Sequence, residues 1–198
     1  MSGWTDFPLS ALGRRQNEAL RRRMASLSPA AARYASPLQR ARETAEALAG
    51  LALGPLRLVS ELRELCCGDM DGLLVSETRR LWPEHWAVHD SQRDEGFRWP
   101  GGESYREHRD RCLLAIERIV AAHPGERVVV VTHCGVISQV LGAMHGLGPE
   151  SLNSWRPGNC SLTEVRWGKD GASLVVFDDR SHLEGIEDSL LLFSAARV

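Results

Sequence analysis

The stretch VVVVTHCGVI, residues 128–137, decides the fold. Four consecutive valines that run into polar residues and a glycine are typical of a short parallel strand buried on both faces. His133 stands just beyond the valines. An apolar segment of helical length follows from Gly135 to His145, with Gly146 as a stop signal. The stretch therefore predicts a buried strand that leads into a helix, with a histidine at the turn between them.

The same alternation of strand and helix continues through the chain. N-cap residues, a proline at a helix start, a capping-box pattern and glycine stop signals mark the boundaries. The predicted elements are a helix from Ser10 to about Leu27, a strand over 33–36, a helix from Pro37 to Gly50, a strand over 56–62 and a long helix opened by Ser104 and Glu107.

Strands that alternate with helices predict an α/β fold, here a three-layer sandwich around a mainly parallel sheet. The segments 160–167 and 173–179 alternate around glycines and predict a late antiparallel hairpin. Short helical pieces broken by prolines predict a cap or lid within residues 66–103. No strand precedes the first helix, so we expect the sheet to lack its first strand. The length of 198 residues predicts one domain over 1–198.

Composition excludes several classes of partner. The net charge is -2, from 24 basic and 26 acidic residues without long blocks of one sign, which argues against nucleic acid binding. The five cysteines show no CxxC spacing and fit reduced cytosolic thiols. No segment approaches the ~20 apolar residues that a membrane helix needs, and no signal peptide pattern opens the chain. We expect a cytoplasmic protein that does not bind a membrane.

Three reactive side chains follow three predicted strands: Arg40, Glu64 and His133. The carboxyl ends of parallel strands lie at one sheet edge, where ligands bind, so we expect the three to share a crevice. Arg40, His133 and the N–H groups of Cys134 and Gly135 at a helix start predict a pocket for phosphate or carboxylate. Glu64 suits a general acid, because burial near a bound anion raises its pKa.

Each of the three also has a purely structural interpretation. His133 at a strand end is equally compatible with a hydrogen bond to nearby backbone. Arg40 is spaced to form an i,i+3 ion pair with Glu43 on a solvated helix face. Glu64 taken alone is a surface charge. The joint placement at three strand ends favours the functional interpretation.

Two other chemistries are open at this point. Cys134 is a candidate nucleophile, because a neighbouring histidine and a helix start lower a thiol pKa, although a small residue in a tight turn explains it as well. His85 and His89 have the i,i+4 spacing of a metal-binding pair, but a third ligand is not evident, and a solvated helix is the alternative to zinc.

Five segments in order resemble the histidine phosphatase superfamily, the phosphoglycerate-mutase-like proteins. They correspond to the family patterns G-x-x-D-x-P-L-S/T, S-P-L-x-R-A-x-E-T-A, L-x-E-x-x-x-G, P-G-G-E-S and the second catalytic histidine. The matching stretches are GWTDFPLSALGRRQ at 3–16, ASPLQRARETAEAL at 35–48, LRELCCGDMDG at 62–72, PGGESY at 100–105 and VVVTHCGVI at 129–137.

The resemblance implies a phosphohistidine mechanism without metal or cofactor. In such enzymes one histidine attacks phosphorus, a second histidine and two arginines hold the phosphoryl oxygens, and a glutamate protonates the leaving oxygen. By position His133 matches the second histidine, Arg40 the second arginine and Glu64 the acid. The positions implied to border the substrate are Cys134, through its backbone, Ser2 and Gly3.

The resemblance also bears on the nucleophile. The family's opening strand ends in R-H-G, which supplies the attacking histidine and the first arginine, about 20 to 25 residues before the G-x-x-D-x-P-L segment. Here Met1 directly precedes that segment. The nucleophile and the first strand are therefore expected to be absent, in agreement with the missing strand inferred above. An unpaired sheet edge and an edge-to-edge homodimer are expected as a consequence.

Two departures from the family pattern concern the substrate. Cys66 and Cys67 stand where the mutases tend to carry an aromatic contact, and no paired arginine insert occurs between 80 and 100. These departures favour a phosphatase acting on a small phosphorylated metabolite, most similar to α-ribazole phosphatases, over a phosphoglycerate mutase. An inactive phosphate-ligand binding or regulatory module is the alternative without a nucleophile.

Overall fold

A computed structural model describes residues 1–27, 29–91, 94, 96–169 and 171–186. Residues 187–198, the end of the predicted domain, lie outside the described residues. The helices and strands are α1 (Ala11–Ala25), β1 (Ala32–Ala35), α2 (Gln39–Ala47), β2 (Leu56–Leu58), α3 (Val75–Leu81), α4 (Pro83–Ser91), α5 (Tyr105–Ala122), β3 (Val128–Val131), α6 (Cys134–Met144), β4 (Leu162–Gly168) and β5 (Gly171–Asp179).

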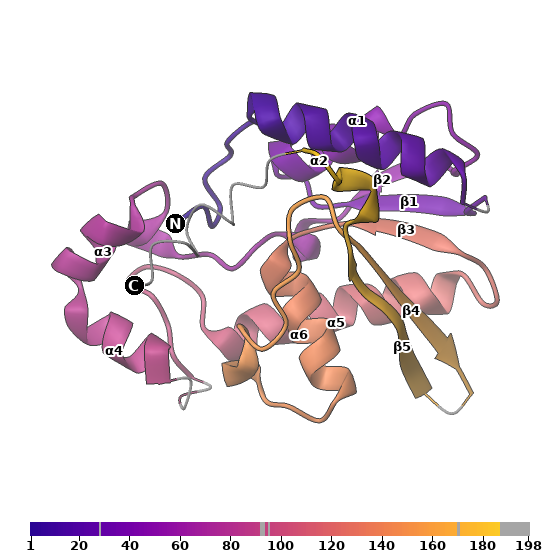
Figure 1. The fold of residues 1–198 in the computed structure, drawn as a ribbon. Coiled ribbons are helices and arrows are strands. Elements are labelled where there is room, and N and C mark those ends of the chain that lie inside the picture. Colours follow the sequence, from indigo (N-terminus) through magenta and orange to yellow (C-terminus); the bar gives the residue numbers. More distant parts are fainter. Residues whose placement is uncertain (28, 92–93, 95, 170, 187–198) are drawn as a thin grey trace.

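A parallel sheet of order β2-β1-β3 forms the centre of the molecule. Arg33 of β1 is in register with Leu56 on one side and Val129 on the other. Helices α1 and α2 cover one face of this sheet, and α5 and α6 cover the other (Figure 1). A separate antiparallel hairpin, β4-β5, completes the fold. The predicted α/β sandwich with a parallel sheet and a late hairpin is confirmed.

The local signals that start the helices act as predicted. The Ser10 hydroxyl accepts a hydrogen bond from Gly13 N–H at 3.0 Å, and Ser104 forms a complete capping box with Glu107 at the start of α5. The strand predicted over 56–62 ends at Leu58, because the chain turns into a 3-10 helix at Ser60–Leu62. That turn directs the next residues, including Glu64, toward the carboxyl ends of the strands.

The valine strand is less buried than its composition predicts. All four valines of β3 are partly exposed, whereas we expected a strand buried on both faces. Among the described residues β3 pairs only with β1 and so forms one edge of the sheet. The side chains of β3 still alternate: Val129 packs toward α1, in a cluster with Leu162 of β4, and Val130 packs toward α5.

The open edge of β3 predicts an uneven pattern of amide exchange. In a parallel strand successive backbone groups point to opposite sides, so about half of the β3 amides face β1 and half face away. We expect the outward amides of β3 to exchange far faster than those of β1, which is paired on both sides. Hydrogen exchange followed by NMR measures this directly. Equal protection along both edges of β3 would instead reveal a second strand partner, as in the predicted edge-to-edge homodimer.

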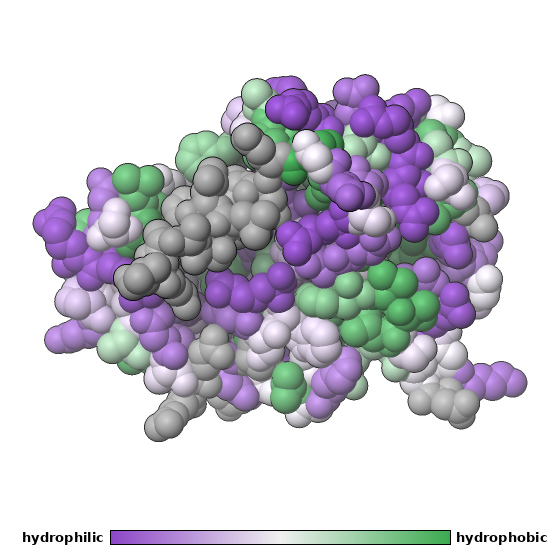
Figure 2. Space-filling view, viewed as in Figure 1, coloured by the Kyte–Doolittle hydropathy of each residue, from purple (hydrophilic) through white to green (hydrophobic). Residues whose placement is uncertain are grey.

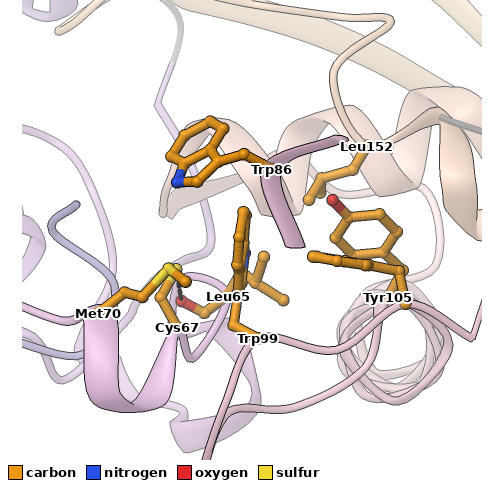
Figure 3. Packing of buried hydrophobic residues seen from close by; sticks show 8 residues of the cluster. Leu65, Cys67, Met70, Trp86, Trp99, Tyr105 and Leu152 are labelled. Carbon is orange, nitrogen blue, oxygen red and sulfur yellow. Dashed lines mark hydrogen bonds between the residues drawn. The ribbon is translucent and has the colours of Figure 1, made fainter. Parts of the chain in front are cut away.

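Residues 66–103, the predicted cap, contain α3 and α4 and supply most of an aromatic cluster that also includes Leu65, Tyr105 and Leu152. Trp86, Trp99 and Tyr105 pack together with Met70 and Cys67 in this core (Figure 3). The cap lies to one side of the sheet, beyond the carboxyl ends of its strands (Figure 1). Leu65 belongs to the same cluster, so the cap core directly anchors the residue that follows Glu64.

The surface exposes apolar side chains on the β4-β5 hairpin and also at other places, among them Leu74 and Leu81 at α3. Apolar side chains gather over the β4-β5 hairpin, where Trp167, Val175, Val176 and Phe177 are exposed (Figure 2). Within the described part of the chain, no helix is both long and apolar enough to cross a bilayer. The five cysteines, all of which are described, are free thiols.

Candidate functional site

The ends of the strands bring Arg40, Glu64 and His133 into one neighbourhood. Arg40 comes from the first turn of α2, Glu64 follows the 3-10 turn after β2, and His133 is the N-cap of α6. Arg40 interacts electrostatically both with Glu64 and with His133. Arg40 therefore lies near enough to influence two side chains that are far from it in sequence.

His133 is a buried, neutral imidazole. Its Nε2 and the Ser36 hydroxyl share a hydrogen bond of 2.7 Å, and Ser36 is itself fully buried at the end of β1. Burial, with a smaller effect from Arg40 and Arg111, lowers the pKa of His133 to about 3. The ring therefore carries no charge near neutral pH. Its partner is a side chain rather than the backbone group of the structural interpretation.

Arg40 is held in place by the N-terminal loop. Its guanidinium donates to the carbonyl oxygens of Thr5 at 2.9 Å and Gly3 at 2.8 Å. Burial lowers its pKa, and the carboxylates of Glu64, Asp6 and Asp71 oppose that shift. The surface ion pair with Glu43 is not formed, because Glu43 binds Arg14 at 3.0 Å instead.

Glu64 has a carboxyl group with two backbone donors. Oε1 accepts the Leu65 N–H at 2.8 Å, and Oε2 accepts the Gly135 N–H at 3.1 Å. Burial raises the pKa of Glu64 above its ordinary value, while these two hydrogen bonds and the nearby arginines act in the opposite direction. The raised pKa agrees with the expectation for a general acid.

The start of α6 differs from the predicted anion pocket in one respect. We expected the Gly135 N–H to be available to a ligand, but Glu64 accepts it. Gly135 also has no room for a side chain, since an added Cβ would lie 2.1 Å from Glu64 Oε1. The helix start therefore binds the acid and does not offer the Gly135 N–H to an anion.

The N-terminal loop borders this site. Gly3 has a φ of +37°, and a Cβ there would lie 1.6 Å from Asp71 Oδ1, so only glycine fits. Trp4 donates its backbone N–H to Asp71 Oδ2 at 2.9 Å and its indole N–H to the Glu64 carbonyl at 2.7 Å. Ser2, exposed at the loop, accepts the Thr5 N–H through its carbonyl. These contacts put Ser2 and Gly3 close to the acid and to Arg40.

Arg111, which no sequence pattern singles out, organises the loop that carries Glu64. Arg111 of α5 donates to the Glu64 carbonyl at 2.8 Å and to the carbonyls of Glu61 and Arg63 at 2.6 and 2.7 Å. It also binds both carboxylate oxygens of Glu103, at 2.8 and 2.5 Å. In the sequence Arg111 is one of several arginines on a helix, and only the fold reveals that it faces this loop.

The two alternative chemistries lose support. The Cys134 side chain is exposed, yet partial desolvation and the nearby Glu64 raise its pKa to about 11, so the expected thiolate does not form near neutral pH. The His89 Nδ1 contacts the Tyr105 hydroxyl, and its ring packs on Trp86 and Trp99 inside the cap. Within the described residues, no three His, Cys, Asp or Glu side chains group as a metal site.

Comparisons with known proteins identify relatives along nearly the whole chain. The model of the histidine phosphatase superfamily (branch 1) matches residues 1–180. Phosphoglycerate mutase-like protein 4 of Arabidopsis thaliana is 34% identical over 187 residues, which cover 93% of this chain and 80% of the relative.

Solved structures agree with this assignment. YhfR of Bacillus stearothermophilus superposes with a TM-score of 0.84 at 32% identity, over 92% of this chain and 90% of its own. The α-ribazole phosphatase of Shigella flexneri gives a TM-score of 0.80 at 22% identity, over 91% and 88% of the two chains, which establishes a shared fold.

Proposed function

Because the chain belongs to the histidine phosphatase superfamily, we propose that Arg40, Glu64 and His133 form a site for the phosphoryl group of a small phosphomonoester. The observation that carries this proposal is the convergence of the three residues at the carboxyl ends of the parallel strands. The N-terminal loop binds both the Arg40 guanidinium and the Glu64 carbonyl, and the helix that His133 caps binds the Glu64 carboxyl group. A guanidinium beside a neutral imidazole suits phosphoryl oxygens, since both groups donate hydrogen bonds to an oxyanion.

The proposed roles follow from the state of each group. Arg40 keeps its positive charge in the presence of three carboxylates and binds phosphoryl oxygens directly. His133, kept in orientation by Ser36, gains a proton or donates its N–H as the anion enters, because a nearby negative charge raises a histidine pKa. Glu64, whose pKa is raised, is the proton donor to the leaving oxygen. The backbone of Cys134 and residues Ser2 and Gly3 border the substrate.

Residues 66–103 are proposed to cover the part of the substrate beyond the phosphoryl group. The cluster of buried residues in the cap includes Leu65, so the cap packs directly against the residue that follows Glu64. The sequence carries no long block of basic residues, which favours a small organic phosphate over a polyanion.

A second function is favoured because no described histidine besides His133 is placed to attack phosphorus. Hydrolysis through phosphohistidine needs a second histidine beside the phosphorus. Among the described residues, the other histidine near Glu64 is His108, which is fully buried and cannot reach a substrate. A module that binds a phosphorylated ligand without turning it over is therefore the alternative to a phosphatase.

Sulfate binding as a function of pH tests the site without requiring turnover. Sulfate stays a dianion between pH 5 and 9, so only protein groups titrate. Ionised Glu64 repels the anion, and we expect the affinity to fall as pH rises through the Glu64 pKa. Glu64→Gln should bind more tightly at high pH and lose the part of this dependence that comes from Glu64, leaving any part that comes from His133. Calorimetric titration measures both proteins, and an identical pH profile for the two would refute the role of Glu64.

Hydrolysis of p-nitrophenyl phosphate then separates the two functions. Turnover at ordinary enzyme rates, lost in His133→Ala, supports the phosphatase. Sulfate binding without turnover supports the binding module, since removing a covalent nucleophile reduces turnover by about a million-fold in the subtilisin precedent.

A further inference from the structure

His108 is a buried histidine to which none of the roles above assigns a function. It lies near the start of α5, is 0% exposed, and neither ring nitrogen has a hydrogen-bond partner among the described residues. A neutral imidazole always carries one N–H donor. Native folds pair nearly all buried polar groups, so an unpaired donor in the interior calls for an explanation.

Glu64 is the acceptor that could pair with the buried N–H of His108. The His108 Nε2 lies 4.0 Å from Glu64 Oε1. Each carboxylate oxygen of Glu64 accepts one backbone N–H, and an ionised carboxylate oxygen has room for a second donor. A shift of about 1 Å in either side chain brings the pair to the usual N–H···O distance.

Gly135 is what lets the two side chains approach the same helix start. A Cβ at Gly135 would lie 2.1 Å from Glu64 Oε1 and 3.2 Å from His108 Cε1. Both groups therefore pack directly against the backbone at the first turn of α6. The imidazole of His108, the carboxyl group of Glu64 and the backbone at the start of α6 are therefore all packed together at Gly135.

We infer that His108 is a positioning residue for Glu64, donating its Nε2–H to Glu64 Oε1 when that carboxyl group is ionised. The inference rests on the proposed role of Glu64 as the proton donor. After Glu64 has given up its proton, a carboxylate remains in a partly desolvated site beside bound phosphate. A neutral N–H donor to Oε1 stabilises the Glu64 carboxylate and fixes its orientation. It adds no positive charge that would slow the release of phosphate.

The surroundings keep His108 neutral, as this role requires. Burial first, and then Arg111 and His133, hold the pKa of His108 well below its ordinary value. Burial also raises the pKa of the nearby thiols, so these stay protonated near neutral pH. Among the described residues, the ionisable groups that interact electrostatically with Glu64 or His108 include Arg40, Arg111, His133, Cys67, Cys112 and Cys134.

A matched pair of variants tests the inference. Glutamine places an amide N–H where the histidine carries Nε2, and methionine has similar length but no donor. The Glu64 pKa is read from the side-chain 13C carboxyl signal during a pH titration in the absence of any anion. We expect His108→Gln to keep the wild-type pKa and His108→Met to raise it by about one to two units, the effect of losing a hydrogen bond to a charged group.

Two results would overturn the inference. One is a Glu64 pKa in His108→Met equal to that of the wild type, and the other is an equal shift in both variants, which a purely structural role would produce. If either variant does not fold, the tautomer of His108 in the wild-type protein is measured by 15N NMR instead. The inference requires the proton on Nε2, and a proton on Nδ1 contradicts it.

The same proteins separate this inference from the proposed function. The Glu64 pKa is measured without ligand, so it reports on His108 whether or not the site binds phosphate. A protein that shows the pKa difference but does not bind sulfate would refute the oxyanion site and leave the His108–Glu64 contact standing. Sulfate binding without a pKa difference would refute the role of His108 alone.

Discussion

Replacing Arg111 with leucine is expected to lower the free energy of unfolding by about 3–5 kcal/mol, the cost typical of removing one partner of a buried ion pair. The side chains of Arg111 and Glu103 are only 18% and 14% exposed, and Arg111 binds both carboxylate oxygens. Its loss leaves Glu103 with the Cys66 N–H as remaining partner and removes the donor of three loop carbonyls. Unfolding in urea measures the effect.

Arg118→Leu is the matched control for this prediction. Arg118 lies on the same helix, its side chain is 66% exposed, and its contact with Glu61 is a long one of 3.8 Å. We expect it to cost less than about 1 kcal/mol, as exposed pairs do. Arg111→Lys should resemble Arg111→Leu more than the wild type, because an ammonium group cannot replace the planar fork of donors. Equal costs for Arg111→Leu and Arg118→Leu would show that Arg111 does not organise the Glu64 loop.

Replacing Arg40 with methionine is expected to weaken sulfate binding by about 10- to 100-fold, since a hydrogen bond to a charged group contributes about 1.5–3 kcal/mol. In the free protein the Arg40 guanidinium is held by the carbonyls of Gly3 and Thr5. It is therefore oriented before the anion arrives, and little ordering is needed on binding. Arg40→Lys should give an intermediate affinity, because it keeps the charge but loses the paired donors.

Arg42→Met is the control on the same helix. The Arg42 side chain is 43% exposed and lies 3.7 Å from Glu46. We expect its sulfate affinity to equal that of the wild type. Thermal melting of all variants identifies any effect that comes from a loosened N-terminal loop. A similar loss of affinity in Arg40→Met and Arg42→Met would indicate non-specific attraction of the anion by positive charge.

Local signals in the sequence were sufficient for most of the fold. The Ser10 cap, the Ser104–Glu107 capping box and the glycine-separated hairpin act within a few residues, so they are readable without the tertiary structure. The burial of the valine strand could not be predicted from the sequence, because burial depends on which strands lie on either side of β3. Four valines predict apolar surroundings, but an edge position leaves part of each side chain exposed.

The same distinction applies to the site. Arg40, Glu64 and His133 were predictable because strand ends of a parallel sheet converge. The groups that hold them were not: Ser36 orients His133, Gly135 and Leu65 bind Glu64, and Arg111 fixes the loop. These contacts join distant segments, and a single serine or arginine carries no local pattern that reveals them. The high Cys134 pKa likewise results first from desolvation and then from the nearby Glu64, and sequence spacing predicts neither.

The most direct test of the central claim is a phosphate titration of the labelled protein followed by NMR at neutral pH. Signals of the Arg40 guanidinium and of the His133 ring are observed in the same series. If both groups bind one phosphoryl group, their signals must move together and give the same dissociation constant, and His133, neutral in the free protein, must gain a hydrogen bond or a proton on saturation. Movement of one signal without the other, or none while phosphate binds elsewhere, would contradict a shared site.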